Sequence, residues 1–319
     1  MKHVFIVNPT AGKGKLQGKF CRSVREYFKS NSIKHEIYIS QSPGDATRFA
    51  RETARRGGRL RFYACGGDGT LYEVINGAYD CENVEFAVVP LGSGNDFART
   101  FGVNGMSPFF DVARQVGGVA RPIDVIRSGS RVAVNICSLG FDAEVAANIP
   151  RFKRLPLVSG SLAYFMSIIY CLFGKVRNGL EITIDGGETI RGDFVFAVAA
   201  NGRWYGGGFK AAPLALCDDG LLDIILVEAV SRLRMLGLIK TFRQGEILTE
   251  DVCRFFRCKR VEIRSKRPAS INTDGECEPG MSATFEVIPG SLRFSIPEGV
   301  DVPLPAPMSL GAERFAESV

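Results

Sequence analysis

Residues 66–77 read GGDGTLYEVING and follow the apolar run 60–65. Glycines placed between a strand and a helix let backbone N–H groups close around phosphates, and the N-terminus of the helix adds positive potential. The carboxylate of Asp68 would repel a phosphate unless a cation lay between them, so its position predicts Mg²⁺ at the site. A plain strand-to-helix turn capped by Asp68 is the alternative. The helix is predicted by apolar residues at helical spacing, namely Leu71, Val74, Ile75 and Ala78.

Two more glycine-containing loops follow runs of strand type. Residues 8–14 (NPTAGKG) follow the run 2–7, and residues 90–96 (PLGSGND) follow the run 86–89. Ligands of parallel α/β sheets bind at the carboxyl ends of the strands, so we expect the three loops to converge on one site.

Polar side chains in these two loops suit a nucleotide. The Thr10 hydroxyl and Lys13 could hold a phosphate, although residues 8–14 lack the spacing of a P-loop. Ser93 and Asn95 are short enough to form hydrogen bonds with ribose or phosphate.

The first half of the chain alternates strand runs with amphipathic stretches, which is typical of a parallel sheet covered by helices. A strand at 35–40 and a helix at 46–56 are predicted, with Asp45 as the N-cap of that helix. We therefore expect an α/β nucleotide-binding domain over residues 1–124. An earlier helix is predicted by an apolar face of Phe20, Val24, Tyr27 and Phe28.

From about Val125 the pattern changes to alternating strands with tight turns. Alternation over 180–184 before Gly186-Gly187 predicts a hairpin. We expect a β-sandwich domain over residues 125–296. Residues 297–319 are expected to form an extended C-terminal tail, and whether it packs back on the first domain stays open. Further strands are predicted at 195–200, 221–227, 261–264 and 284–288.

One segment raises the question of a membrane. Residues 155–174 carry no charged side chain, and this length meets the criterion for a spanning helix. Pro156 and Gly160 interrupt the segment, and basic residues stand at both of its ends. We therefore expect a buried or membrane-facing helix rather than a spanning one.

Length and composition bound the class of protein. The 319 residues suggest about two domains, and 45% hydrophobic with 23% charged residues is typical of a soluble globular protein. The short apolar run at the start is no signal peptide, which predicts a cytoplasmic protein. Nine cysteines without a Cys-x-x-Cys pair argue against a disulfide framework or a zinc site. Only His3 and His35 are present, so acid-base chemistry is expected of carboxylates.

Four motifs together resemble a known family. Residues 8–14, 66–77, 90–99 (PLGSGNDFAR) and 272–276 (NTDGE) look like the diacylglycerol kinase catalytic-domain family, which includes bacterial soluble lipid kinases and sphingosine kinases. The resemblance implies an α/β nucleotide-binding domain like that of phosphofructokinases and NAD kinases, followed by a β-sandwich. It also implies ATP as co-substrate and Mg²⁺ as cofactor.

The resemblance assigns residues to these ligands. It places Asp68, Asp96 and Asp124 in a network of magnesium and water. A structural Mg²⁺ would bind the carboxylate of Asp219 and two backbone carbonyls, those of Leu216 and Leu221. The ATP site would be lined by Asn8, Thr10, Gly12, Ser40, Gly66, Gly67, Asp68, Gly69, Thr70, Glu73 and Ser93. Taken alone, the segment 216–221 predicts a hairpin turn.

A lipid hydroxyl that attacks the γ-phosphate of ATP needs an acceptor for its proton. With so few histidines, Asp274 and Glu276 are the candidates, and the family pattern places the base in this Asp-x-Glu unit. We favour Glu276, with Asp274 as the other candidate. An Asp-Gly turn that closes a hairpin is the structural alternative.

We therefore predict an ATP-dependent lipid kinase with Glu276, Asp274 and Asp68 as catalytic residues. Diacylglycerol leads as acceptor, and a sphingoid base or phosphatidylglycerol is an alternative. An NAD kinase shares GGDGT, but the Gly-Ser-Thr-Ala-Tyr-type motif of that family is missing. A nucleotide- or lipid-binding sensor without turnover would need no base. We expect peripheral contact with anionic membranes and no nucleic-acid partner, and a homodimer stays open.

Overall fold

The structure is a computed structural model that describes residues 1–102, 105–155, 158, 160–174 and 176–300. The predicted tail therefore lies outside the described residues from position 301 onward. Within the described chain, two compact units separate. The first contains residues 1–123 and 290–300, and the second contains residues 124–289.

The first unit contains a parallel sheet. β1 (Lys2–Val7) pairs with β2 (His35–Ile39) and β3 (Leu60–Gly66), and β3 pairs with β4 (Val84–Pro90), all in parallel. The end of β13 (Glu276–Ile296) joins β4 in parallel at Phe294. Every residue of β3 and β4 is buried, as expected for parallel strands covered on both faces. All the loops that leave the carboxyl ends of β1 to β4 therefore begin at one edge of the sheet.

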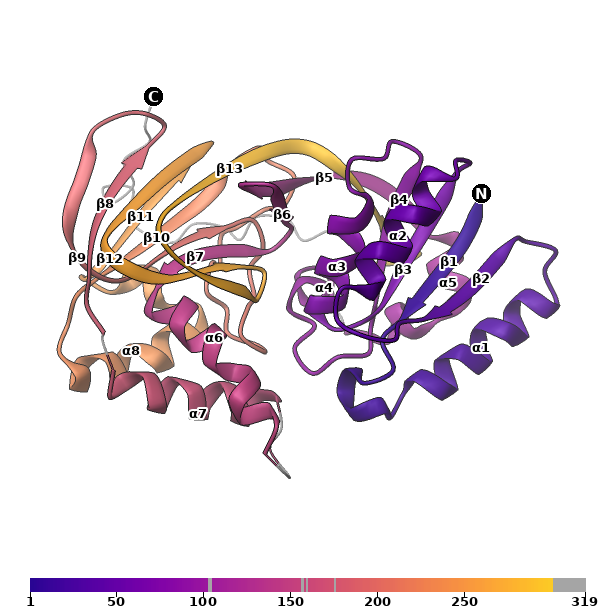
Figure 1. Cartoon of the computed structure of the whole chain (residues 1–319), viewed down its shortest axis with the longest axis horizontal. Helices are drawn as coiled ribbons and strands as arrows, with labels where there is room; N and C mark the ends of the chain where they lie inside the picture. Colours follow the sequence, from indigo (N-terminus) through magenta and orange to yellow (C-terminus); the bar gives the residue numbers. More distant parts are fainter. Residues whose placement is uncertain (103–104, 156–157, 159, 175, 301–319) are drawn as a thin grey trace. The chain divides into compact units, whose positions relative to one another are not determined.

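Helices cover this sheet (Figure 1). The amphipathic face of α1 is confirmed, because Phe20, Val24 and Phe28 are buried in one core with residues of β1, β3 and β4. The prediction that Asp45 caps α2 is wrong: Gly44 is the cap with φ 80°, and the Asp45 carboxylate accepts the N–H of Gln41 at 2.8 Å. The helices are η1 (Ala11–Gly14), α1 (Gln17–Lys29), α2 (Asp45–Arg55), α3 (Asp68–Ala78), α4 (Asp96–Phe101), η2 (Ser107–Phe110) and α5 (Val112–Gly117).

The second unit is mostly antiparallel β structure. Two of its strands, β9 and β12, change partners along their length: each pairs with β8 in its first part and with β7 in its second. This folds the sheet over an apolar core and confirms the sandwich-like prediction. The strands are β5 (Val119–Ser128), which leads into the unit, β6 (Arg131–Ala133), β7 (Ile136–Gly140), β8 (Asn178–Ile184), β9 (Thr189–Ala200), β10 (Leu222–Glu228), β11 (Cys253–Cys258), β12 (Arg260–Thr273) and β13.

Three helices of the second unit lie together on one side of its strands (Figure 1). They are α6 (Phe141–Lys153), α7 (Gly160–Leu172) and α8 (Arg232–Gln244), and η3 (Ile247–Thr249) follows α8. A second apolar core lies between these helices and β9 and β10. The expected helix within 155–174 is α7, whose Ile168 is buried and whose Phe165 is exposed. Among the described residues, no helix is both long and apolar enough to cross a membrane.

Candidate active site

Asn8 links the first two glycine-containing loops of the first unit. It directly follows β1, and its backbone N–H donates to the carbonyl of Cys65 at 3.0 Å. Its side-chain amide donates to the Thr70 hydroxyl at 3.2 Å, while its Oδ1 accepts the N–H and the hydroxyl of Thr10 at 3.0 and 2.9 Å. The residues after β1 and after β3 thus form one hydrogen-bonded set.

Glycines let the third loop pack against the other two. The N–H of Gly92 donates to Gly66 O at 3.1 Å, and a Cβ on Gly92 would lie 2.3 Å from the Cα of Gly67. A Cβ on Gly12, whose φ is 55°, would lie 2.4 Å from Leu91 O. Only glycine fits at such backbone contacts. The three loops therefore converge at one edge of the sheet, as their order in the sequence predicts.

Asp68 begins α3 and reaches the start of α4. Its carboxylate accepts the N–H of Phe97 at 3.3 Å. Backbone N–H groups of Asn95 and Asp96 also stabilise its ionised form. Burial raises the pKa of Asp68 above its usual value, and these N–H groups oppose the rise. The carboxylate thus has partners within the protein. A role for Asp68 in binding Mg²⁺ stays a prediction.

The other predicted nucleotide residues also lie in the first unit. Ser40 follows β2 and donates its N–H to Val7 O at 2.9 Å. Glu73, in the second turn of α3, accepts the N–H of Gly44 at 3.0 Å and so holds the turn before α2. Ser93 is exposed in the third loop. Contact of these side chains with ATP stays a prediction.

Asp274 lies in the second unit, in the turn between β12 and β13. This turn closes a hairpin, with φ 49° at Asp274 and 97° at Gly275. One carboxylate oxygen accepts the N–H of Val134 at 2.7 Å, and the other accepts the N–H of Ile136 at 2.8 Å. The N–H of Asn135 adds a third donor at 3.1 Å. Asp274 therefore anchors the connection between β6 and β7, and its lone pairs are engaged.

Glu276 differs from Asp274 in its surroundings. It is exposed at the first position of β13 and pairs with Thr273 across the turn. Within the described part of the chain its carboxylate accepts no hydrogen bond, so it is available to take a proton. The Asp274 carboxylate is engaged by three N–H groups, whereas that of Glu276 is exposed. The role of Glu276 as the base stays a prediction.

The segment 216–221 is not a tight hairpin turn, and that prediction is wrong. It ends the long connection 201–221 between β9 and β10, whose residues Ala211, Leu214 and Ala215 are buried in the core beside the helices. These buried side chains require the longer connection.

Oxygen-bearing groups gather around this segment. Asp219 accepts the N–H of Leu221 at 3.0 Å and lies 3.7 Å from the guanidinium of Arg257. Asp124 accepts the N–H of Gly220 at 2.7 Å. Burial raises the pKa of Asp223 to about 7, and the charge of Asp219 adds to the rise while Arg257 opposes it. Carboxylate oxygens are the ligands that a hard divalent cation prefers. Binding of Mg²⁺ by Leu216, Asp219 and Leu221 stays a prediction.

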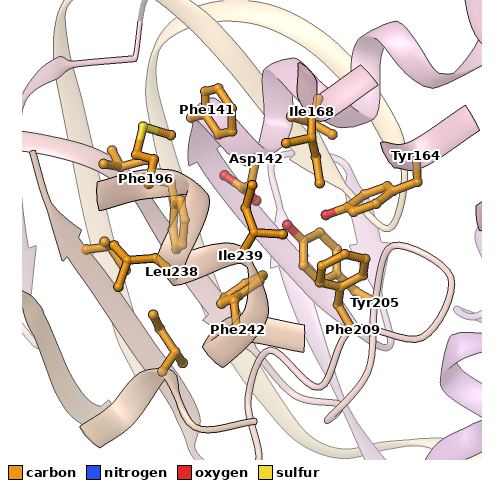
Figure 2. Close-up of a pocket in the computed structure, with 15 residues that line it drawn as sticks. Phe141, Asp142, Tyr164, Ile168, Phe196, Tyr205, Phe209, Leu238, Ile239 and Phe242 are labelled. Carbon is orange, nitrogen blue, oxygen red and sulfur yellow. The ribbon is translucent and has the colours of Figure 1, made fainter. Parts of the chain in front are cut away.

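The second unit also contains a pocket that the sequence did not predict. It is a cavity of about 50 Å³ that lies between α6, α7, α8 and the strands beneath them (Figure 2). Its lining is apolar or aromatic except for one carboxyl group, that of Asp142. The lining residues are Phe141, Asp142, Val145, Tyr164, Ile168, Val195, Phe196, Tyr205, Phe209, Val227, Met235, Leu238, Ile239, Phe242 and Ile247. These residues are too far apart in the sequence to form a local motif. In the sequence, only the apolar segment 155–174 indicated this part of the protein.

Comparisons with known proteins agree with the two-part architecture. Residues 2–128 match the diacylglycerol kinase catalytic domain, and residues 135–296 match the YegS C-terminal NAD kinase beta sandwich-like domain. A diacylglycerol kinase of Bacillus subtilis is 28% identical over 276 residues, which cover 85% of this chain and 88% of the relative. A Pseudomonas fluorescens protein named "Probable lipid kinase YegS-like" is 33% identical over 281 residues, which cover 84% of this chain and 87% of the relative.

A solved structure shows the same fold over nearly the whole chain. It is the crystal structure of a candidate diacylglycerol kinase of Bacillus anthracis, with a TM-score of 0.71 and 25% sequence identity. The similarity covers 92% of this chain and 96% of that one. With both domains matched in order, the chain belongs to the diacylglycerol kinase family of lipid kinases, in which a diacylglycerol kinase catalytic domain precedes a YegS-type C-terminal domain.

Proposed function

We propose that the protein transfers the γ-phosphate of ATP to the hydroxyl of a lipid, with diacylglycerol as the leading acceptor and phosphatidic acid as its product. Membership in the kinase family supports phosphoryl transfer. The observation that carries the proposal further is the apolar pocket of the second unit. Its apolar and aromatic lining suits an acyl chain rather than a dinucleotide.

The chain's own groups supply the parts that this reaction needs. Backbone N–H groups of the glycine loops and the N-terminus of α3 would hold the phosphates. Bound Mg²⁺ would neutralise charge on the phosphates, with Leu216, Asp219 and Leu221 as the residues for a structural ion. Glu276 would accept the hydroxyl proton as the lipid oxygen bonds to the γ-phosphorus and the bond to the bridging oxygen of ADP breaks.

We also propose that the protein binds anionic membranes peripherally. Phe165 on α7 is 51% exposed, and Phe173 and Leu233 are 85% and 82% exposed. The side chain of Arg232 donates to Leu172 O at 2.8 Å, which joins the start of α8 to the end of α7. These apolar side chains thus lie on neighbouring helices.

Basic residues accompany this apolar surface. Arg151, Lys153 and Arg154 are exposed at the end of α6, which packs along α7. Clustered cations are attracted to anionic headgroups, each by about 1 kcal/mol. A bilayer held there would present lipid to the helices that line the pocket.

Labelled ATP, Mg²⁺ and a panel of acceptors test the function. Diacylglycerol, a sphingoid base, phosphatidylglycerol and NAD should be offered separately. Label in a lipid product supports the proposal, label in NADP would identify an NAD kinase, and ATP binding without transfer to any acceptor would indicate a sensor.

A further inference from the structure

The one carboxyl group of the pocket is buried without an adequate partner. Asp142 is the second residue of α6 and only 3% exposed. Neither carboxyl oxygen makes a hydrogen bond of normal geometry with any described residue. Interactions with the Ser138 hydroxyl and the N–H of Ala143 lower the pKa of Asp142, but by less than burial raises it. A buried polar group without hydrogen-bond partners destabilises the folded protein unless a ligand binds to it.

The surroundings of Asp142 make its neutral acid form easier to reach than that of an ordinary aspartic acid. Burial raises the pKa of Asp142 to about 6. Among the described residues, the causes of this rise include no neighbouring cation that would stabilise the ionised form. The residues of α8 that line the pocket are all apolar. An acyl chain in the pocket would exclude water and favour the neutral form further.

The other polar groups that face the pocket are hydroxyls. Figure 2 shows the carboxyl of Asp142 and the hydroxyl ends of Tyr164 on α7 and Tyr205 in the 201–221 connection directed toward the middle of the pocket. Among the described residues that line the pocket, Asp142 carries the one carboxyl group.

The polar end of the pocket lies beside the turn that carries Glu276. β7, which directly precedes α6, pairs with β12 so that Ser138 is opposite Asn272. The Cys277 thiol donates to Ala143 O at 3.6 Å, which joins the first turn of α6 to the start of β13. A lipid whose chain fills the pocket would therefore have its polar head near Glu276.

We propose that Asp142, as the neutral acid, donates a hydrogen bond to a carbonyl oxygen of an acyl chain of the acceptor, which makes acyl-ester or acyl-amide lipids the preferred substrates. The inference rests on the proposed lipid kinase function and deepens it. An ether lipid or a free sphingoid base offers no such carbonyl and leaves the buried carboxyl unpaired. Sites that hydrogen-bond their substrate reject analogues lacking the partner for this reason.

The test compares 1,2-diacylglycerol with the matching 1,2-dialkylglycerol in the full-length protein and in Asp142→Asn and Asp142→Leu. The parent should prefer the ester by about 10-fold in kcat/KM, the value of roughly one hydrogen bond. Asp142→Asn keeps an N–H donor and should keep the preference, whereas Asp142→Leu should lose it. The KM for ATP should stay unchanged in both variants. Asp193→Asn, an exposed acid of β9, is the matched control.

The pH dependence of the ester preference gives a second readout. The ester preference of the parent should decline as the pH rises and Asp142 ionises, while that of Asp142→Asn should not change with pH. Equal use of ester and ether by the parent, or an unchanged preference in a folded Asp142→Leu, would overturn the inference but leave the kinase proposal intact. Loss of the preference in a folded Asp142→Asn would show that a hydrogen-bond donor at this position does not produce it, and would also overturn the inference. Failure of the parent to phosphorylate any lipid would overturn both proposals.

Discussion

The carboxylate of Asp274 accepts the backbone N–H of Val134 at 2.7 Å, and this contact ties the β12–β13 turn to the connection between β6 and β7. Its other oxygen accepts the N–H of Ile136. These hydrogen bonds commit both oxygens of Asp274 to holding the two connections together. The two acidic residues of the Asp-Gly-Glu unit therefore have different expected roles, structural for Asp274 and catalytic for Glu276.

Substitution separates these roles. Glu276→Gln should lower kcat by about 10² to 10⁴ with little change in ATP affinity, because the amide cannot accept a proton. Asp274→Asn should instead lower the free energy of unfolding by about 1 to 3 kcal/mol, because its amide group cannot satisfy all three N–H donors. Steady-state kinetics, ATP binding and thermal unfolding measure the two effects. Full activity in Glu276→Gln, with loss of turnover in a stable Asp274→Asn, would exchange the assignments.

A second prediction concerns Asp68 and the N–H of Phe97. Asp68→Asn keeps an oxygen for this hydrogen bond, so the fold should survive, but the negative charge at the phosphate loops is lost. If that charge holds Mg²⁺, turnover should fall by about 10² to 10³. The assay uses saturating ATP and Mg²⁺, with circular dichroism to check folding. Activity within a factor of two of the parent would leave Asp68 with only its structural role at the start of α4.

Much of this organisation is readable from sequence because its causes are local. The apolar spacing of α1 and the alternation in β8 follow from helix and strand periodicity, and glycines mark the three loops. The loops' convergence follows from the rule for parallel strands. The prediction that Asp45 caps α2 was wrong because Gly44, in a left-handed conformation, takes the cap position. The side-chain preferences of capping residues do not reveal this.

Long-range relationships explain what the sequence did not reveal. The pocket draws on residues from Phe141 to Ile247, whose proximity depends on α8 packing beside α6 and α7. The anchoring role of Asp274 depends on Val134, far away along the chain. A partnerless carboxyl such as Asp142 can be recognised only when its neighbours in space are known.

Asp142 should also affect the pH dependence of stability. Its folded pKa of about 6 lies above the ordinary value of 3.8. The folded state therefore binds the proton more tightly, and this contribution is complete below about pH 3.8 and is lost as the pH rises through 6. Asp142→Asn cannot ionise, so it should unfold with a free energy larger by on the order of 2 kcal/mol at pH 8 than the parent, and the gain should vanish near pH 4. Denaturant unfolding at both pH values measures this, and an equal gain at both would contradict it.

Membrane binding should depend on charge at the end of α6. Replacing Arg151, Lys153 and Arg154 with serine should weaken sedimentation with anionic vesicles by about 100-fold, since each cation contributes roughly 1 kcal/mol. Neutral vesicles should bind weakly, and added salt should release the parent. The matched control replaces Arg51, Arg55 and Arg56, exposed cations of the first unit. Binding that resists high salt and yields only to detergent would contradict peripheral attachment.

The most direct test of lipid phosphorylation follows the label from γ-labelled ATP and Mg²⁺ into diacylglycerol presented in mixed micelles. Parent protein and Glu276→Gln are compared at equal concentration, with confirmed folding and ATP binding. The account predicts labelled phosphatidic acid that accumulates with the parent and is reduced at least 100-fold with Glu276→Gln. Equal labelling by both proteins would contradict the assignment of the base. No labelling of diacylglycerol or any other lipid by the folded parent would contradict the proposed kinase function itself.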